Sequence, residues 1–456
     1  MKIKMRLIGI IIVGIISFCI NAIADDNSSS RYSDEPTTIR TDRVPERPVP
    51  ALELFQGFQR AGPLGYEAMM PTGMVISPFF ALYGTYRSGI QMIDENGSEH
   101  TAIEWAHRMD ALANLTLSGT ERILIGTSNR WNRTFQPEDE TDNQADIDIT
   151  TAFFEFDLTE VLAKLDWEGT KPLDYGFTVG RQRIFIDDGF LIDDTMDSIV
   201  VTRNTIHIPG TSYARVAALY AWNGIDRATA KKDHVEGDLY GLFATIDRHH
   251  STIDLGMTYL NSPTKSGGDQ YNVSLASQQP ILLFNTSFDT TFRISKSGGI
   301  DGETAESGNG TLFYTGISWA PKGTDNIAYF NAFGAFGKYT PTSREIAGPL
   351  GRAGLLFSGN GLSKTFGAPI SNRTEETHGA ALGYQMFFDG HRRNVVLEIG
   401  AREERTTGGI DKIGMAVNVA QSIRQRMFIE VGGFGIKPED SRHNTFGFRT
   451  TFAFTF

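Results

Sequence analysis

The chain has 456 residues, of which 40 % are hydrophobic and 21 % are charged, and its formal net charge is −12. This composition is too polar for a helical membrane protein, and the acidic balance disfavours nucleic acid as a partner. Aromatic residues make up 11 % of the chain and glycine occurs 48 times, which suits strands with interfacial aromatic girdles and tight turns.

Residues 1–24 have the pattern of a secretory signal peptide that is removed on export. Three basic residues between positions 2 and 6 precede an apolar run at 7–20, and Ala22-Ile23-Ala24 provides a small-x-small cleavage site. An N-terminal transmembrane helix fits less well, because the run has about 14 residues and a span requires roughly 20. Cleavage leaves 39 Lys and Arg against 54 Asp and Glu, a formal charge of −15, and removes Cys19, the one cysteine.

Residues 25–73 show neither a helical nor a strand period. They contain Asn27-Ser28-Ser29-Ser30 and a proline-rich stretch at 44–50, so the region is predicted to be a flexible periplasmic tail. A short helix around 52–58 that rests on or in the following domain is the alternative.

Residues 74–456 consist of repeated stretches in which apolar and polar side chains alternate, each followed by a turn. A period of two is that of a β-strand, whose successive side chains point to opposite faces. The count is about eighteen strands, an even number as single-chain bacterial barrels have, and soft boundaries leave 16 as the alternative. The expected strands are 75–92, 104–118, 121–132, 147–158, 174–185, 196–206, 212–222, 237–248, 251–261, 270–278, 286–296, 310–320, 326–337, 375–389, 393–404, 409–421, 425–436 and 444–456.

The connections between these strands alternate in length. Tight ones, such as Ser118-Gly119-Thr120 and His249-His250, alternate with long ones, such as 338–375. Two connections, 158–173 and 405–408, depart from the pattern without erasing it. Membrane barrels sort their connections into short periplasmic turns and long extracellular loops, whereas a soluble sandwich has no reason to do so. The predicted fold is therefore all-β, a closed antiparallel transmembrane β-barrel.

The last strand shows the alternation most clearly. One face carries Phe446, Phe448, Phe452, Phe454 and Phe456, and the other carries small or polar residues that include Arg449 and Thr451. In a membrane barrel the aromatic face contacts lipid and the polar face contacts a watery lumen.

Charged residues on the inward faces of the strands are the candidates for function. Arginine rings or ladders create a positive constriction that attracts anions, and nearby carboxylates sharpen the field. Equally, such residues solvate a wide pore or bridge between strands, and the sequence does not show which charges meet at one height. The predicted pore-lining set is Arg87, Arg215, Arg293, Arg402, Lys412, Arg449, Glu155, Asp289, Glu398 and Glu430.

The most distinctive internal stretch is 178–194. Here a strand that ends in basic residues precedes an acidic loop, which is expected to be extracellular. Strict alternation turns Arg181 and Arg183 the same way as Tyr175 and Phe177, so either a bulge re-aims them or they sit above the membrane. The motif residues are Gly180, Arg181, Gln182, Arg183, Asp187 and Asp188.

This motif resembles the strand-and-loop motif of bacterial alginate-export outer-membrane proteins, which are large Gram-negative porins. The resemblance implies an eighteen-stranded barrel with an arginine-rich lumen that passes an anionic polysaccharide, in the outer membrane of a Gram-negative bacterium. It also implies outer-membrane lipid and lipopolysaccharide as surroundings. The terminal Phe456 resembles the signal by which the barrel-assembly machinery recognises its substrates. Whether such a barrel is a monomer or a trimer is open.

Two loops leave alternatives open. The acidic loop 138–148 offers carboxylates for Ca²⁺ but lacks the glycine-pivoted spacing of an EF-hand, so solvated surface acids are the favoured interpretation. The segment 338–373 is long and rich in glycine. It is equally plausible as a constriction loop folded into the lumen and as an extracellular loop.

Enzymatic motifs are missing from the sequence. The nine histidines are scattered without H-E-x-x-H spacing, and no G-x-S-x-G elbow occurs. The prediction is thus a non-enzymatic channel, without cofactor or metal, for hydrophilic solutes such as anionic sugars or oligosaccharides. A general diffusion porin is the runner-up, followed by a barrel enzyme and a structural barrel.

Overall fold

The computed structural model describes residues 50–55, 68–95, 101–135, 142–165, 171–227, 236–283, 286–300, 302, 304, 306–344, 348–359, 361–362, 366–440 and 444–456. The expected signal peptide, most of the expected tail and part of the acidic loop 138–148 lie outside these residues. In the part of the chain that is described, no helix is long and apolar enough to cross a bilayer.

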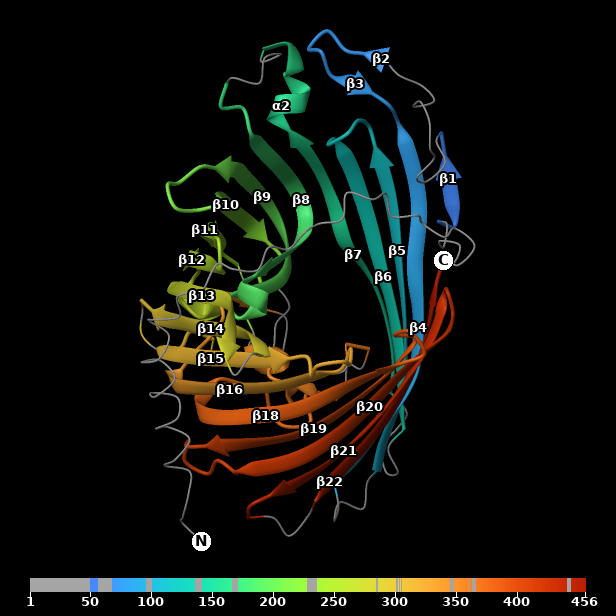
Figure 1. The fold of residues 1–456 in the computed structure, drawn as a ribbon, viewed down its shortest axis with the longest axis vertical. Coiled ribbons are helices and arrows are strands. Elements are labelled where there is room, and N and C mark those ends of the chain that lie inside the picture. The colour runs from blue at the N-terminus through green and yellow to red at the C-terminus, as the bar shows by residue number, and fades with distance from the viewer. Residues whose placement is uncertain are drawn as a thin grey trace.

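Eighteen antiparallel strands form one closed barrel (Figure 1). Each strand pairs with the next, and β22 pairs with β4 from Thr445 opposite Glu95 to Thr455 opposite Thr85, which closes the ring. The barrel strands are β4 (Phe79–Glu95), β5 (Thr101–Thr116), β6 (Arg122–Phe135), β7 (Asp142–Asp157), β8 (Tyr175–Ile186), β9 (Ile192–Ile206), β10 (Tyr213–Asn223), β11 (Asp238–Arg248), β12 (Ser251–Asn261), β13 (Gln270–Leu283), β14 (Thr286–Gly299), β15 (Gly310–Trp319), β16 (Ile327–Lys338), β18 (Glu375–Phe388), β19 (Arg393–Glu404), β20 (Lys412–Arg424), β21 (Met427–Pro438) and β22 (Thr445–Thr455).

The predicted barrel and its count of eighteen strands are confirmed, and the alternative of 16 is wrong. The strands predicted at 251–261 and 393–404 have the predicted bounds. The remaining described elements are short. They are β1 (Leu52–Leu54), β2 (Ala68–Met69), β3 (Val75–Ile76), β17 (Ser343–Arg344), α2 (Leu158–Val161), and the 3-10 turns η2 (Ala163–Leu165), η3 (Asp187–Gly189), η4 (Thr264–Ser266), η5 (Pro349–Arg352) and η6 (Leu355–Phe357).

The two ends of the barrel differ as the connection lengths predict. We call the end with connections such as 249–250 and 425–426 the turn end, and the end with 224–237 and 339–374 the loop end. The one long connection at the turn end, 158–174, holds α2 and η2. It docks on its neighbours, because Glu160 accepts a hydrogen bond from the Gly119 backbone N–H at 3.1 Å and the Lys164 N–H donates to the Thr72 carbonyl at 3.0 Å.

Side chains alternate between an apolar outer face and a largely polar inner face. On β12, Leu255 and Met257 are exposed on the outside while Thr258 is buried inside. The sequence of β11 left its orientation open, and the structure turns Tyr240 and Leu242 outward and Leu239 and Phe243 inward. The direction is set by its ladder partners, since Tyr240 lies opposite Tyr259 on β12.

The N-terminal strand β1 completes the seam of the barrel. Residues 52–54 form a strand, not the short helix considered from the sequence, and pair with β4 at residues 80–82. On the same edge of β4, Gly84 exchanges two backbone hydrogen bonds with Phe456, of 2.9 and 3.0 Å. The described N-terminal strand and the C-terminal residue therefore lie end to end (Figure 1), and β1 pairs the part of β4 that β22 does not reach.

Deletion of residues 50–55 should lower the temperature at which the folded barrel converts to the unfolded form on a heat-modifiability gel. The deletion leaves backbone groups of residues 80–82 without ladder partners, and such groups are costly in an apolar environment. Glu53→Gln keeps the strand and serves as the control. An unchanged transition after the deletion would show that β1 does not stabilise the seam.

Candidate functional site

The hairpin β8–β9 leaves the barrel wall and folds into the interior. Ladder pairs join β8 to β7 only from Gly176 to Arg181, and join β9 to β10 only from Ile206 to Asp197. Beyond these points β8 and β9 pair with each other up to Ile186 and Ile192. The acidic segment after β8 is therefore not the extracellular loop predicted from the sequence, because its tip reaches the inner face of β14.

Local backbone conformations permit this bend. Gly180 has φ +123°, a region that only glycine adopts readily, and a Cβ there would lie 2.3 Å from the Ala152 carbonyl oxygen. At the tip, Asp187, Asp188 and Gly189 all have positive φ, and aspartate is among the few other residues that tolerate this region. The motif read as Gly-Arg-Gln-Arg and Asp-Asp thus marks the start and the tip of the infolded hairpin.

Apolar packing holds the hairpin against the wall. Its fully buried residues Leu191, Ile192 and Met196 lie in one cluster with Leu219, Leu239 and Leu260 of β10 to β12. On the other side, the ring centroid of Phe190 lies 5.0 Å from that of Tyr314 on β15. Burial of side chains of this size contributes roughly 1.5–3 kcal/mol each.

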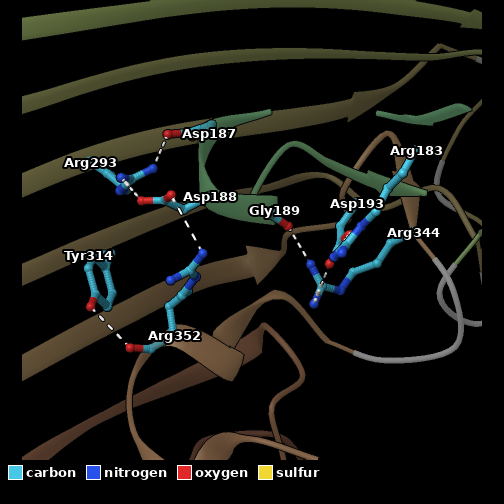
Figure 2. Close-up of polar contacts among 9 residues, drawn as sticks. All are labelled: Arg183, Asp187, Asp188, Gly189, Asp193, Arg293, Tyr314, Arg344 and Arg352. Carbon is cyan, nitrogen blue, oxygen red and sulfur yellow. Dashed lines mark hydrogen bonds and ion pairs between the residues drawn. The ribbon is translucent and has the colours of Figure 1, made fainter. Parts of the chain in front are cut away.

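Arg293 on β14 receives the tip. Its guanidinium forms ion pairs with both Asp187 and Asp188, and its side chain is only 3 % exposed (Figure 2). Because the side chains of Arg293 and Asp187 are each only 3 % exposed, the desolvation of both charges offsets much of their attraction. We therefore assign the pair to positioning the tip more than to stabilising it.

The described parts of the segment 339–374 form the second element inside the barrel. Of the two alternatives left open by the sequence, the described parts fit the constriction loop, since Leu350, Leu356, Phe357 and Ile370 are fully buried in a cluster with inward residues such as Phe333. The segment also binds the hairpin, because β17 pairs in parallel with Ile192 and Asp193 of β9. The hairpin β8–β9 and the described parts of 339–374 are therefore joined, and we call the two together the infolded body.

Two charged residues of the predicted pore-lining set hold this segment. Glu398 accepts hydrogen bonds of 2.8 Å from the backbone N–H groups of Leu355 and Leu356, and Arg402 donates to the carbonyls of Ser371 and Arg373 at 2.8 and 2.7 Å. Both side chains point inward, yet each residue is only 4 % exposed. The segment 339–374 covers both side chains, so they do not line the open part of the lumen.

The other predicted residues also project into the barrel, most of them as members of pairs. Arg87 pairs with Asp110 at 3.1 Å, Arg449 pairs with Glu430 at 3.5 Å, and Glu155 pairs with Arg122. The remaining three residues of the predicted pore-lining set are Arg215, Asp289 and Lys412. Arg215 and Asp289 are exposed, and Lys412 is half-buried. Their part in solute passage stays a prediction.

Register creates a row of arginines that the sequence analysis missed. Arg87 on β4 lies directly opposite Arg108 on β5, which lies directly opposite Arg130 on β6. All three face inward, because the outer face of these strands carries Ile90, Trp105 and Trp131. The sequence contains each arginine, but only the strand register places them side by side.

The infolded body presents two exposed guanidinium groups close to one aromatic ring. The guanidinium carbons of Arg183 and Arg352 lie 5.2 and 5.6 Å from the ring centroid of Phe185, and their side chains are 64 and 59 % exposed. Asp193 accepts a 3.0 Å hydrogen bond from Arg183, and Asp188 lies 3.9 Å from Arg352 (Figure 2). Arg352 was not a predicted site residue, because its segment has no regular period.

A cavity of about 420 Å³ adjoins this ring. Its lining combines Phe185 and Phe243 with hydroxyl and amide groups such as Gln278. The charged lining residues are Asp187, Asp188, Arg215, Asp254 and Arg293, of which Arg293 already pairs with Asp187 and Asp188. Guanidinium groups bind carboxylates, aromatic faces stack on sugar rings, and carboxylates and amides bind hydroxyls. The cavity thus has the chemistry to hold a hydroxylated anion.

Comparisons with known proteins support the fold. No protein-family model and no curated protein matches the sequence. The barrel shares its fold with solved outer-membrane porins of Pseudomonas aeruginosa. OpdQ superposes with a TM-score of 0.55 at 10 % identity, covering 83 % of this chain and 98 % of OpdQ. OccK5 (OpdH) gives a TM-score of 0.56 at 10 % identity, with 82 and 97 % covered. OccK2 (OpdF), solved in complex with glucuronate, gives 0.56 at 9 % identity, with 82 and 97 % covered.

At these identities the likeness concerns the fold alone. The resemblance to alginate-export proteins therefore stays a prediction.

Arg293→Met should release the hairpin tip and increase single-channel conductance in planar bilayers. The substitution leaves the buried Asp187 without its cation, and loss of one partner of a buried ion pair typically costs about 3–5 kcal/mol. Asp188 keeps only the 3.9 Å contact with Arg352. Lys296→Met, which removes a cation from the outer face of the same strand, is the matched control. Wild-type conductance in the Arg293 variant would mean that the tip does not narrow the channel.

Proposed function

We propose that the chain is an outer-membrane channel for hydrophilic solutes that favours anions, in particular carboxylated sugars or oligosaccharides. The observation that carries this proposal is the pair of exposed guanidinium groups, Arg183 and Arg352, which both lie within 6 Å of the centre of the exposed ring of Phe185. They belong to the body that narrows the lumen, so a passing solute meets them. Buried cations such as Arg293 and Arg402 contribute to this body but not directly to its surface.

The row of Arg87, Arg108 and Arg130 supports the same preference. Positive side chains at one level of a lumen attract anions and disfavour cations. Asp110 partly neutralises the row, since it binds Arg87 at 3.1 Å and Arg108 at 2.8 Å. A paired row of this kind offers anions transient sites without trapping them, which passive conduction requires.

The substrate class rests on the cavity chemistry and on one neighbour. OccK2 (OpdF) has been solved with glucuronate, a carboxylated sugar. The cavity beside Phe185 offers Arg215 for a carboxylate and Gln278 and Asp254 for hydroxyl groups. Alginate, the solute that the sequence resemblance implies, is a polymer of such sugar acids and remains within this proposal. A general diffusion porin without specificity is the second candidate.

The setting of the channel is proposed on the sequence. Residues 1–24 direct export, and residues 74–456 form the barrel in the Gram-negative outer membrane. Residues 25–73 form the periplasmic segment, of which Leu52–Leu54 pair with β4 at the edge of the barrel. The barrel-assembly machinery would recognise β22 with its terminal Phe456, and lipopolysaccharide and other outer-membrane lipids would surround the outer face. The chain is proposed to act without a cofactor and without catalysis.

Charge selectivity tests the proposal directly. In planar bilayers under a salt gradient, the reversal potential of the wild type should favour anions, and Arg183→Gln combined with Arg352→Gln should reduce that preference. A matched control is Lys322→Gln with Arg392→Gln, which removes two charges from turn-end connections. Wild-type preference for cations would refute the anion channel, and the absence of any current would refute transport.

Current block separates a specific channel from a general porin. Oligomers of uronic acid should interrupt the current at lower concentration than neutral oligosaccharides of equal length, and Arg215→Gln should weaken the block because it removes the exposed guanidinium of the cavity. Equal block by charged and neutral sugars in the wild type would favour the general porin.

A further inference from the structure

A row of tyrosines on the outer face marks where the barrel meets the aqueous phase at the loop end. Tyr220, Tyr240, Tyr259 and Tyr271 are exposed on four consecutive strands, β10 to β13. The hydroxyls of Tyr220 and Tyr259 donate to Asp238 at 2.9 Å and to Asp269 at 2.6 Å, both at the loop end. Tyrosines in this arrangement form the aromatic girdle of a membrane interface.

A lysine continues this girdle on β14. Lys296 is exposed, and its flanking residues Ser295 and Ser297 are buried on the inside, so its side chain points outward. It lies opposite Val273 on β13 and opposite Thr311 on β15. Val273 is itself exposed on the outer face. The ammonium group therefore sits among apolar and aromatic side chains at the level of the interface.

Lys437 on β21 has the same surroundings. It is exposed and directed outward, lies opposite the exposed Ile413, and has the exposed Met415 and Phe446 close by in the ladders.

Arg133 on β6 is the third cation of this kind. It lies opposite the exposed Trp105, and its guanidinium carbon lies 5.0 Å from the ring centroid of Phe135. Within the part of the chain that the structure describes, Lys296, Lys437 and Arg133 form no ion pair with a carboxylate.

We propose that Lys296, Lys437 and Arg133 bind the phosphate groups of the phosphorylated glycolipid of the outer leaflet. A cation that faces lipid is unfavourable unless water or an anion meets it. All three residues lie within three positions of the loop ends of their strands, where a membrane barrel meets the headgroup region. Phosphate accepts charge-assisted hydrogen bonds from ammonium and guanidinium groups, and acyl chains pack on neighbours such as Val273 and Met415. The inference rests on the proposed outer-membrane location, with the loop end outside.

The three sites lie on β6, β14 and β21, which are far apart around the ring. A single protein partner would not span them, whereas a lipid leaflet surrounds the whole barrel. This distribution is the reason to assign a lipid and not a docking protein.

Native mass spectrometry of the detergent-solubilised barrel tests the assignment, with bis-phosphorylated lipid A as the probe. The variant with Lys296→Gln, Lys437→Gln and Arg133→Gln should bind lipid A roughly five-fold more weakly per site, the effect of one cation near a charged lipid surface. The control removes three cations from the turn end, Lys322→Gln, Arg392→Gln and Arg424→Gln, and should bind as the wild type does. The charge-conserving variant Lys296→Arg, Lys437→Arg, Arg133→Lys should also bind normally.

Three results would overturn the proposal: undiminished lipid A binding by the triple glutamine variant, equal binding of dephosphorylated lipid A by the wild type, or equal binding of phosphatidylglycerol. The last would assign a general preference for anionic lipid. Heat-modifiable mobility verifies that each variant is folded. Reversal potentials should be the same in the wild type and the glutamine variant, so a failure here is separable from a failure of the anion channel.

Discussion

The structure depends on one constraint, which is that the backbone N–H and C=O groups at the edges of a sheet need hydrogen-bond partners. The pairing of β22 with β4 meets this need by removing both edges, and β1 extends the pairing to residues 80–82. Closure also separates two surfaces. The outer one carries side chains such as Leu255 and Met257, and the inner one is free to carry charge. All later features, from the constriction to the girdle, follow from that separation.

Inside the ring, buried charge positions the elements that narrow the lumen. Arg293 locates the hairpin tip, and Glu398 and Arg402 locate the segment 339–374. The desolvation of such groups offsets much of their attraction, so apolar clusters around Leu191 and Leu356 provide the stability while the charges specify the geometry. A cation in the barrel interior therefore either holds the infolded elements in place, when it is buried, or is available to a solute, when it is exposed. Arg293 supports the constriction, whereas Arg183 and Arg352 are exposed on its surface.

The acidic net charge and the proposed anion preference are compatible. The acids near the constriction are engaged, since Asp187, Asp188 and Asp193 all contact guanidinium groups. On the outer face, Lys296, Lys437 and Arg133 are exposed and form no ion pair with a described carboxylate. Local placement of charge, and not the total, governs what approaches each surface of the barrel.

The sequence by itself determined the strand count, the closed barrel and the inward or outward direction of most side chains. It could do so because apolar and polar residues alternate along most strands and the outer face must be apolar. It also identified the motif from Gly180 to Asp188 as unusual. Only the tertiary structure decided that this motif enters the lumen, because the bend depends on contacts with Arg293 and with β10 to β12, which lie far along the chain. The same holds for the arginine row on β4 to β6 and for the pairing of Arg352 with Asp188. Strand register and loop path bring these residues together, and neither leaves a local period in the sequence.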